Sequence, residues 1–159
     1  MTLRRVVAFR AAGVACAADP ADVERILRPA SLLPAPGAPS WIAGLVSGPR
    51  GLLAVIDVGR RLFPEREAPP PRDLLAGTFD GFPAALGAEV VEGILAVEEA
   101  EGLPPEGLAP VVSECLKGVV VAGGARRLLL DVRRLVTGEP ARLAAQIASD
   151  ATERRDQSS

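Results

Sequence analysis

The residues most able to do chemistry in this chain are pairs of acidic side chains. Glu89 precedes Glu92 by three positions, and Glu98 adjoins Glu99, so either pair could serve acid and base catalysis or bind a cation. Histidine is absent, which removes imidazole as base, proton shuttle or ligand, and with it the common catalytic triads and most zinc sites. Since no metal-binding loop is recognisable, we expect both pairs on a solvated face, with no catalytic residue, metal or cofactor.

Serine, glycine and arginine patterns give no reactive centre either. Ser47 and Ser113 lack the context of a nucleophile elbow, and Gly48-Pro49-Arg50-Gly51 lacks the Gly-x-x-x-x-Gly-Lys-Ser/Thr pattern of a phosphate-binding loop. Arginine doublets are expected at solvent-facing positions of capping turns, where cations are favoured near helix C-termini. These doublets are Arg60-Arg61, Arg126-Arg127 and Arg133-Arg134.

Composition argues against several classes of partner. The 159 residues include 18 basic and 20 acidic side chains, a formal charge of −2 that gives no global attraction to nucleic acid or anionic membrane. Aromatic residues make up 3% of the chain, and no apolar run approaches the roughly 20 residues of a membrane span. We expect a cytoplasmic protein that binds no nucleic acid and inserts into no membrane, with Cys16 and Cys115 as free core thiols.

The chain is organised around the stretch Trp41–Phe63. Two short apolar runs, Ile42–Val46 and Leu52–Ile56, flank a cluster of glycine and proline that predicts a tight connection between two strands. Asp57 follows the second run, and its carboxylate can accept hydrogen bonds from the free N–H groups of a helical turn that starts at Val58.

Three segments recur in the same order. Val23–Leu27 returns as Val91–Leu95, 68 positions later. The second and third pairs lie about 74 positions apart in the printed sequence: Gly44–Gly48 with Gly118–Gly123, and Asp57–Leu62 with Asp131–Leu135. Shared order and similar spacing indicate two copies of one supersecondary unit.

Further elements follow from local pattern. Apolar runs joined by turn residues predict hairpins over 6–18 and 74–86, the second turning at Asp80-Gly81, and a proline-rich connector over 64–73. We also expect a helical turn over 21–27, a loop over 98–110, strands over 111–122 and 127–130, a helix over 139–148 and a fraying tail over 149–159.

The central stretch resembles the core motif of the CheW family, the adaptor domains of bacterial chemosensory arrays. Arg50, Gly51 and Asp57 match the family's order of strand, Arg-Gly turn, strand, aspartate and short helix. Gly48-Pro49 stands where Asn-Leu is usual, and the proline usual in the second strand is absent at Val55.

This resemblance implies an all-β fold of two small five-stranded SH3-like barrels side by side, followed by a C-terminal helix. We expect a CheW-like domain over 1–137, with one subdomain over about 14–66 and a second over about 74–137 that the N-terminal strand could join. Residues 138–159 would form the helix and a polar tail.

The same resemblance implies a non-enzymatic adaptor that scaffolds chemoreceptors with a CheA-type histidine kinase. Its partners would be the regulatory domain of the kinase and the signalling tip of a methyl-accepting chemoreceptor. The implied partner-binding residues are Val23, Arg25, Ile26, Val46, Arg50 and Gly51. Two alternatives stay open at the residue level: Arg50 could simply close its turn, and Val23 and Ile26 could be core.

Two other functions also remain open. The chain could be a diverged CheW-like module of another motility, localisation or kinase pathway. A small β-barrel enzyme or nucleic-acid binder is the other alternative, although the sequence supplies no convergent polar constellation for it.

Overall fold

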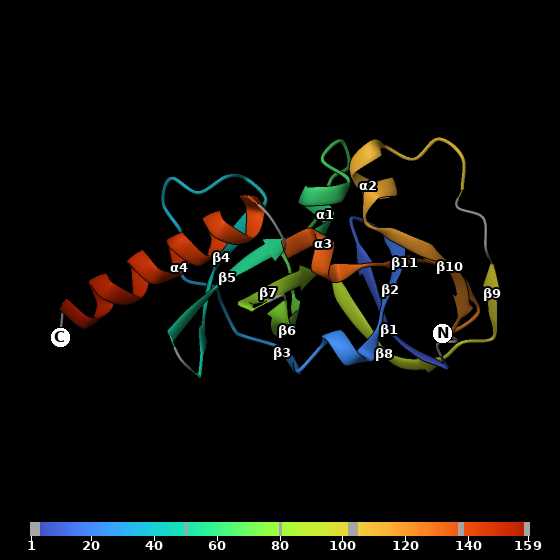
Figure 1. Ribbon diagram of the computed structural model, residues 1–159, viewed down its shortest axis with the longest axis horizontal. Coiled ribbons are helices and arrows are strands. Elements are labelled where there is room, and N and C mark those ends of the chain that lie inside the picture. Colours follow the sequence, from blue (N-terminus) through green and yellow to red (C-terminus); the bar gives the residue numbers. More distant parts are fainter. Residues whose placement is uncertain (1–3, 50, 80, 102–104, 137–138, 158–159) are drawn as a thin grey trace.

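The computed structural model describes residues 4–49, 51–79, 81–101, 105–136 and 139–157 (Figure 1). Within these residues, strands form a six-stranded sheet in the order β8-β1-β2-β11-β10-β9 and a five-stranded sheet in the order β3-β6-β7-β5-β4. The first sheet contains β1 (Arg5–Ala11), β2 (Val14–Ala18), β8 (Val90–Ala96), β9 (Glu99–Glu101), β10 (Leu116–Ala122) and β11 (Ala125–Leu130). The second contains β3 (Arg25–Leu27), β4 (Ile42–Gly48), β5 (Gly51–Asp57), β6 (Asp73–Phe79) and β7 (Phe82–Ala88).

Short helices join the strands, and one longer helix ends the chain. They are the 3₁₀ turn η1 (Pro20–Asp22), α1 (Val58–Leu62), α2 (Pro110–Glu114), α3 (Val132–Val136) and α4 (Glu139–Gln157). The mostly β fold with a C-terminal helix is therefore confirmed.

Each sheet closes into a barrel through one bent strand. β8 pairs with β1, and the chain then bends so that the Glu98 N–H donates to the Val121 carbonyl at 2.8 Å and β9 pairs with β10. In the other sheet, β3 pairs with β6, and the chain continues to Leu33, which exchanges two hydrogen bonds of 2.9 and 2.8 Å with Leu45 of β4.

We call the body of β3–β7 barrel 1 and the body of β1, β2 and β8–β11 barrel 2. Counting each bent strand once, each barrel has five strands within the described residues, and closure leaves few exposed edges.

The repeat seen in the sequence is a repeat of structure in which the two halves exchange hairpins. β3 corresponds to β8, β4 to β10, β5 to β11 and α1 to α3, while the β6–β7 hairpin lies 68 positions after β1–β2. The β1–β2 hairpin pairs with β8 and β11, and β6–β7 pairs with β3 and β5. Each half of the chain thus completes the barrel of the other half.

The strand grouping corrects the expected subdomains over 14–66 and 74–137. β6 and β7 belong to barrel 1, and β2 belongs to barrel 2 together with the N-terminal strand. The chain changes barrels at η1, which leads from β2 into β3. Asp19 caps this turn by accepting the Ala21 N–H at 2.9 Å. Figure 1 shows the two barrels side by side, with α4 running along barrel 1 and away from barrel 2.

Apolar side chains form one large shared core and two small ones. The large cluster contains Phe9, Cys16 and Val119 from barrel 2, Ile56, Leu75 and Leu86 from barrel 1, and residues of α1, α3 and α4. Each small cluster takes its residues from one sheet: Val6, Val120 and Leu129 lie in barrel 2, and Val55, Leu74 and Ala85 in barrel 1. The shared cluster makes the two barrels one body.

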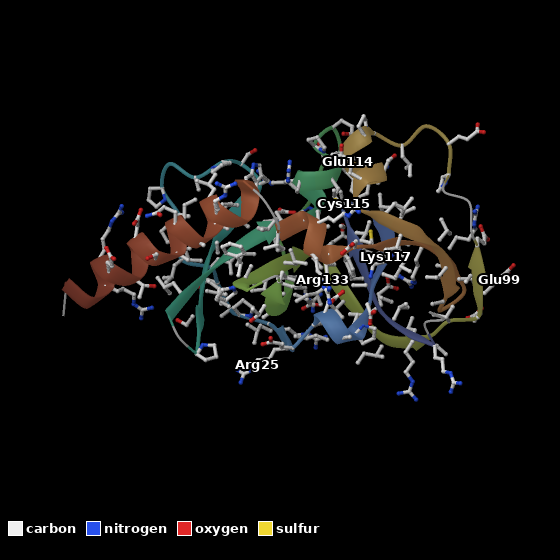
Figure 2. The ribbon with its side chains drawn as sticks, viewed as in Figure 1. Arg25, Glu99, Glu114, Cys115, Lys117 and Arg133 are labelled. Atoms are coloured by element: carbon white, nitrogen blue, oxygen red, sulfur yellow. The ribbon has the colours of Figure 1, made fainter. Side chains whose placement is uncertain are left out.

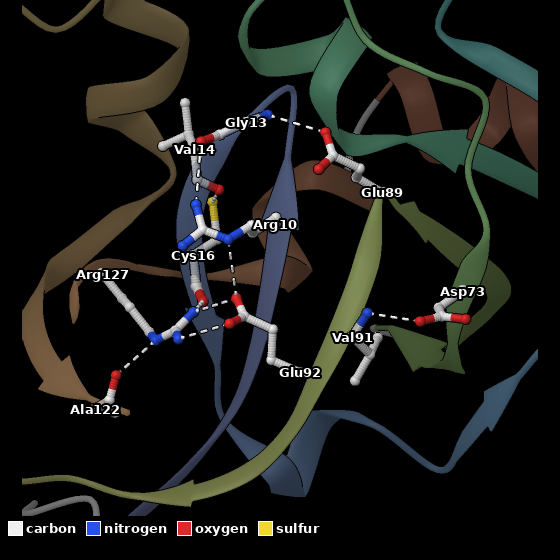
Figure 3. Close-up of polar contacts among 10 residues, drawn as sticks. All are labelled: Arg10, Gly13, Val14, Cys16, Asp73, Glu89, Val91, Glu92, Ala122 and Arg127. Atoms are coloured by element: carbon white, nitrogen blue, oxygen red, sulfur yellow. Dashed lines mark hydrogen bonds and ion pairs between the residues drawn. The ribbon is translucent and has the colours of Figure 1, made fainter. Parts of the chain in front are cut away.

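Barrel 2 contains a polar network, centred on a buried charge, to which all five of its strands contribute a residue (Figure 3). Arg127 on β11 is 1% exposed and donates to the Ala122 carbonyl on β10, to the Cys16 carbonyl on β2 and to both carboxylate oxygens of Glu92 on β8, at 2.9 to 3.4 Å. Arg10 on β1 lies 3.4 Å from the same carboxylate. The expectation that both members of the Arg126-Arg127 doublet face solvent is therefore wrong for Arg127, because these acceptors satisfy its guanidinium inside the barrel.

Several local predictions hold and others fail. The hairpins β1–β2, β4–β5 and β6–β7 are confirmed, although Asp80 lies outside the described residues. The helical turn expected over 21–27 is wrong, because only η1 forms before β3. Within the loop expected over 98–110, the short strand β9 pairs with β10. The strand expected over 111–122 is helical at its start, because α2 begins at Pro110 and continues to Glu114. The helix expected over 139–148 continues well beyond 148 as α4.

The two cysteines are free and buried. Burial raises the pKa of Cys16 to about 12, although Arg127 and Arg10 oppose the shift, and burial is also the main cause of the raised pKa of Cys115. Both thiols stay protonated at neutral pH and serve as small core residues.

The Arg127 network predicts a pH-dependent stability. Hydrogen bonds from Arg127 hold the pKa of Glu92 below its usual value, against the effect of burial, and the charges of Arg127 and Arg10 add to them. A carboxyl with a lowered folded-state pKa contributes stability above its unfolded pKa of about 4.3 and loses it as the pH falls through the folded value. Glu92→Gln removes the anionic partner of the buried Arg127 guanidinium, so it should lower stability by on the order of 1–3 kcal/mol at pH 7. The difference from wild type should shrink below about pH 4.

Urea unfolding at a series of pH values measures this difference. Glu99→Gln is the matched control, because Glu99 is an exposed carboxylate on β9. A Glu92→Gln penalty that stays constant between pH 3 and pH 7 would contradict the assignment.

Candidate interaction surface

The described residues among the predicted partner contacts fall into two groups on barrel 1. Val23 lies just before β3 and Arg25 and Ile26 lie on it, whereas Val46 and Gly51 lie on β4 and β5. In the sheet order, β3 and β4 are the two end strands. Arg50, the residue on which the sequence places most weight, lies outside the described residues.

The β3 group presents one apolar and one basic side chain to solvent. Ile26 pairs with Leu75 of β6 and is 39% exposed, and Arg25 beside it is also exposed. Figure 2 shows Arg25 directed away from the body at the rim of the molecule. Val23 is half-buried against the shared core, so of the two apolar residues Ile26 is the more available for a partner.

An ion pair between the buried Asp22 and the exposed Arg133 fixes this surface relative to α3. Asp22, at the end of η1 and 5% exposed in its side chain, accepts a hydrogen bond of 3.1 Å from Nε of Arg133. The Val23 N–H donates to the Pro20 carbonyl at 3.1 Å, and the Glu24 N–H donates to the Ala76 carbonyl at 2.9 Å. The entry to β3 is thus held by three elements before the exposed pair Arg25 and Ile26.

The β4–β5 group is built around the turn that joins these strands. Val46 is half-buried and packs against the small core of barrel 1, as Leu27 and Leu32 also do, so its side chain contributes mainly to that core. Gly51 pairs with Gly48 and has a φ of +136°, a conformation that side chains with a Cβ rarely adopt. A Cβ on Gly51 would also lie 3.1 Å from Oγ1 of Thr152.

Thr152 of α4 is the residue of this region that the sequence pattern misses. Its Oγ1 accepts the Leu52 N–H at 3.1 Å and donates to the Ala148 carbonyl at 2.9 Å. Ala144 and Ala148 on the same helix are buried against the shared core. The polar composition of 149–159 predicts a fraying tail, whereas α4 continues to Gln157. In the sequence, only the apolar spacing of Ile147 and Ala151 indicates that the helix continues.

The far end of β5 is held by a helix cap. Asp57 accepts the Arg60 N–H at 3.2 Å, as the sequence predicts, and its own N–H donates to the Trp41 carbonyl at 2.8 Å. Burial raises the pKa of Asp57, although the hydrogen bonds and charge at Arg60 oppose the shift. The Arg61 guanidinium stacks over the Trp41 ring, 5.4 Å from its centroid, which secures the start of β4.

Comparison with known proteins defines the family. The sequence model of the CheW-like domain matches residues 5–139. The chain belongs to the CheW-like domain family. Protein FrzA of Myxococcus xanthus is 34% identical over 118 residues, which span 73% of each chain. The crystal structure of the scaffolding protein TtCheW from Thermoanaerobacter tengcongensis superimposes with a TM-score of 0.71 at 17% identity, covering 88% of this chain and 92% of that one.

Family membership makes this chain a CheW-like adaptor of the chemotaxis type and not an enzyme, and the solved scaffold has the same fold. Across the described ranges, no three histidine, cysteine, aspartate or glutamate side chains group as metal ligands. None of the described helices has the length and apolar character needed to cross a membrane.

The bond between Thr152 and Leu52 gives a prediction about the turn. Thr152→Val keeps the shape of the side chain but removes the acceptor, so it should lower stability by about 1 kcal/mol and speed hydrogen exchange at the Leu52 amide. Thr152→Ser keeps the hydroxyl and should retain slow exchange at that amide. Exchange measured by NMR that is equally slow in the Val variant would show that the bond does not hold the turn.

Proposed function

We propose that the protein is a cytoplasmic signalling adaptor that holds chemoreceptor signalling tips and a CheA-type histidine kinase in one geometry. The observation that carries this proposal is the CheW-like match across residues 5–139, which includes both barrels. The adaptor domain is taken as 1–137 and the remainder as its helical tail.

The receptor tip is assigned to the surface around Arg25 and Ile26. A receptor helix can place an apolar side chain against the exposed Ile26 and a carboxylate against the guanidinium of Arg25. Arg50 and Gly51 are proposed to extend the contact from the β4–β5 turn, with Val23 and Val46 supporting it from half-buried positions.

The kinase is assigned to the remaining faces of the barrels. Since bent strands close both barrels, few backbone edges are left for strand addition, and docking depends on side chains and loops. The shared core and the exchanged hairpins make the two barrels one body. A receptor and a kinase bound to it therefore keep a fixed relative position, which is the physical basis of coupling.

Charge introduced at Ile26 tests the receptor assignment. Ile26→Asp should reduce co-purification with a receptor signalling domain, assayed without the kinase, about tenfold or more, because a carboxylate would replace the apolar anchor. Ile94→Asp is the matched control: Ile94 occupies the corresponding place on β8 of barrel 2 and is 57% exposed. Arg50→Glu should likewise abolish co-purification with unchanged far-UV circular dichroism and melting temperature.

The outcomes separate function from folding. Equal loss of binding in the Ile26 and Ile94 variants would overturn the location of the surface. Retention of binding in both Ile26→Asp and Arg50→Glu would overturn the receptor assignment. Unfolding of Arg50→Glu would assign that residue to closing the turn.

A further inference from the structure

A groove separates α4 from the segment that leads into β4, and none of its described lining residues is among the predicted partner contacts. It has a volume of about 370 Å³ and lies between residues 33–36 on one side and Ile147, Ala151 and Arg155 on the other, with Leu45 and Leu52 also lining it. This volume is at the lower end of the roughly 300–1,000 Å³ found for binding pockets. We call it the α4 groove.

The lining of the α4 groove is apolar and partly open to solvent. Leu33 is 43% exposed, although it is a large apolar residue whose backbone is fixed to β4 by two hydrogen bonds. Ile147 and Ala151 are half-buried on the helix side. An apolar strip of this kind loses contact with water when a partner side chain fills it.

Backbone chemistry decides what kind of segment can bind there. Pro34 and Pro36 have no N–H, the N–H and carbonyl of Leu33 already bond to Leu45, and the Ala35 carbonyl accepts the Ala38 N–H at 3.1 Å. On β5, the Leu52 N–H is taken by Thr152. An added strand would find few backbone partners, whereas a helix satisfies its own backbone and needs only side-chain contacts.

The charged residues on the α4 side of the groove indicate which polar side chains a partner helix should carry. Arg154 and Arg155 line the groove against a single carboxylate, Asp150, which already accepts a hydrogen bond of 2.8 Å from Gln146. Arg155 is exposed near the end of α4. A guanidinium beside an apolar strip suits a partner helix that carries a carboxylate next to its apolar face.

We propose that the α4 groove is a docking site for an acidic amphipathic helix of a partner protein. Leucine-type side chains of that helix fill the space between Leu33 and Ile147, and its flanking glutamate or aspartate pairs with Arg155. This is an additional interaction surface, on which the function proposed for Arg25 and Ile26 does not depend.

Two designed peptides provide the probe. Both have 18 residues and a stripe of leucines along one helical face; one has glutamates beside the stripe and the other has lysines in their place. Titrated into the full ¹⁵N-labelled chain, the glutamate peptide should shift the amide signals of Leu33, Leu45, Leu52 and Ile147. It should also bind at least about tenfold more tightly than the lysine peptide.

Matched variants complete the test. Leu33→Ser and Arg155→Glu should each weaken binding of the glutamate peptide about tenfold. Two controls should leave it unchanged: Ile94→Ser, which removes an exposed isoleucine from barrel 2, and Arg142→Glu, which alters an exposed arginine earlier on α4.

Three results would overturn the proposal: no shifts at the four amides, equal affinity for the two peptides, or equal effects of the groove and control variants. Co-purification with receptor and kinase, measured on the same Leu33 and Arg155 variants, reports separately on the proposed function. Loss of peptide binding with retained co-purification is the expected pattern.

Discussion

Each barrel of the molecule is completed by a hairpin that the sequence repeat assigns to the other half. Without β6–β7, barrel 1 would lack the strands that join β3 to β5, and without β1–β2, barrel 2 would lack those between β8 and β11. Neither half of the chain can therefore close its own barrel or cover its share of the common core. This exchange turns two small barrels, each too small for a substantial core, into one cooperative body.

Buried polar groups then fix how the two barrels meet. Asp73 of barrel 1 is 1% exposed and accepts the N–H of Val91 at the start of β8 at 2.7 Å, while its other oxygen accepts from Nε of Arg28 at 3.1 Å. Asp22 and Arg133 make a second link between the entry to β3 and α3. Such directional bonds admit one arrangement, whereas an apolar interface alone would tolerate sliding. An adaptor that couples two partners needs this defined geometry more than it needs a reactive group.

The sequence predicts what depends on neighbouring residues and misses what depends on distant ones. The β4–β5 hairpin and the Asp57 cap follow from apolar runs, turn residues and one carboxylate. The exchange of hairpins leaves no local signal, since strands keep the same pattern whichever barrel they join. Arg127 looks like a surface residue until strands far apart in the chain supply its acceptors, and Thr152 looks like part of a polar tail although it bonds to Leu52, 100 positions away. Of the predicted surface, Ile26 is exposed as its assigned role requires, and Val46 packs inward.

Pulse-labelling hydrogen exchange across a urea titration tests the single cooperative body most directly. Peptides from β3–β5 report on barrel 1 and peptides from β8–β11 report on barrel 2, while the fluorescence of Trp41, the only tryptophan, gives an independent signal beside α1. If the exchanged hairpins bind the halves together, all three probes show one transition with the same midpoint. Protection lost in one barrel at a urea concentration where the other remains protected would contradict the account.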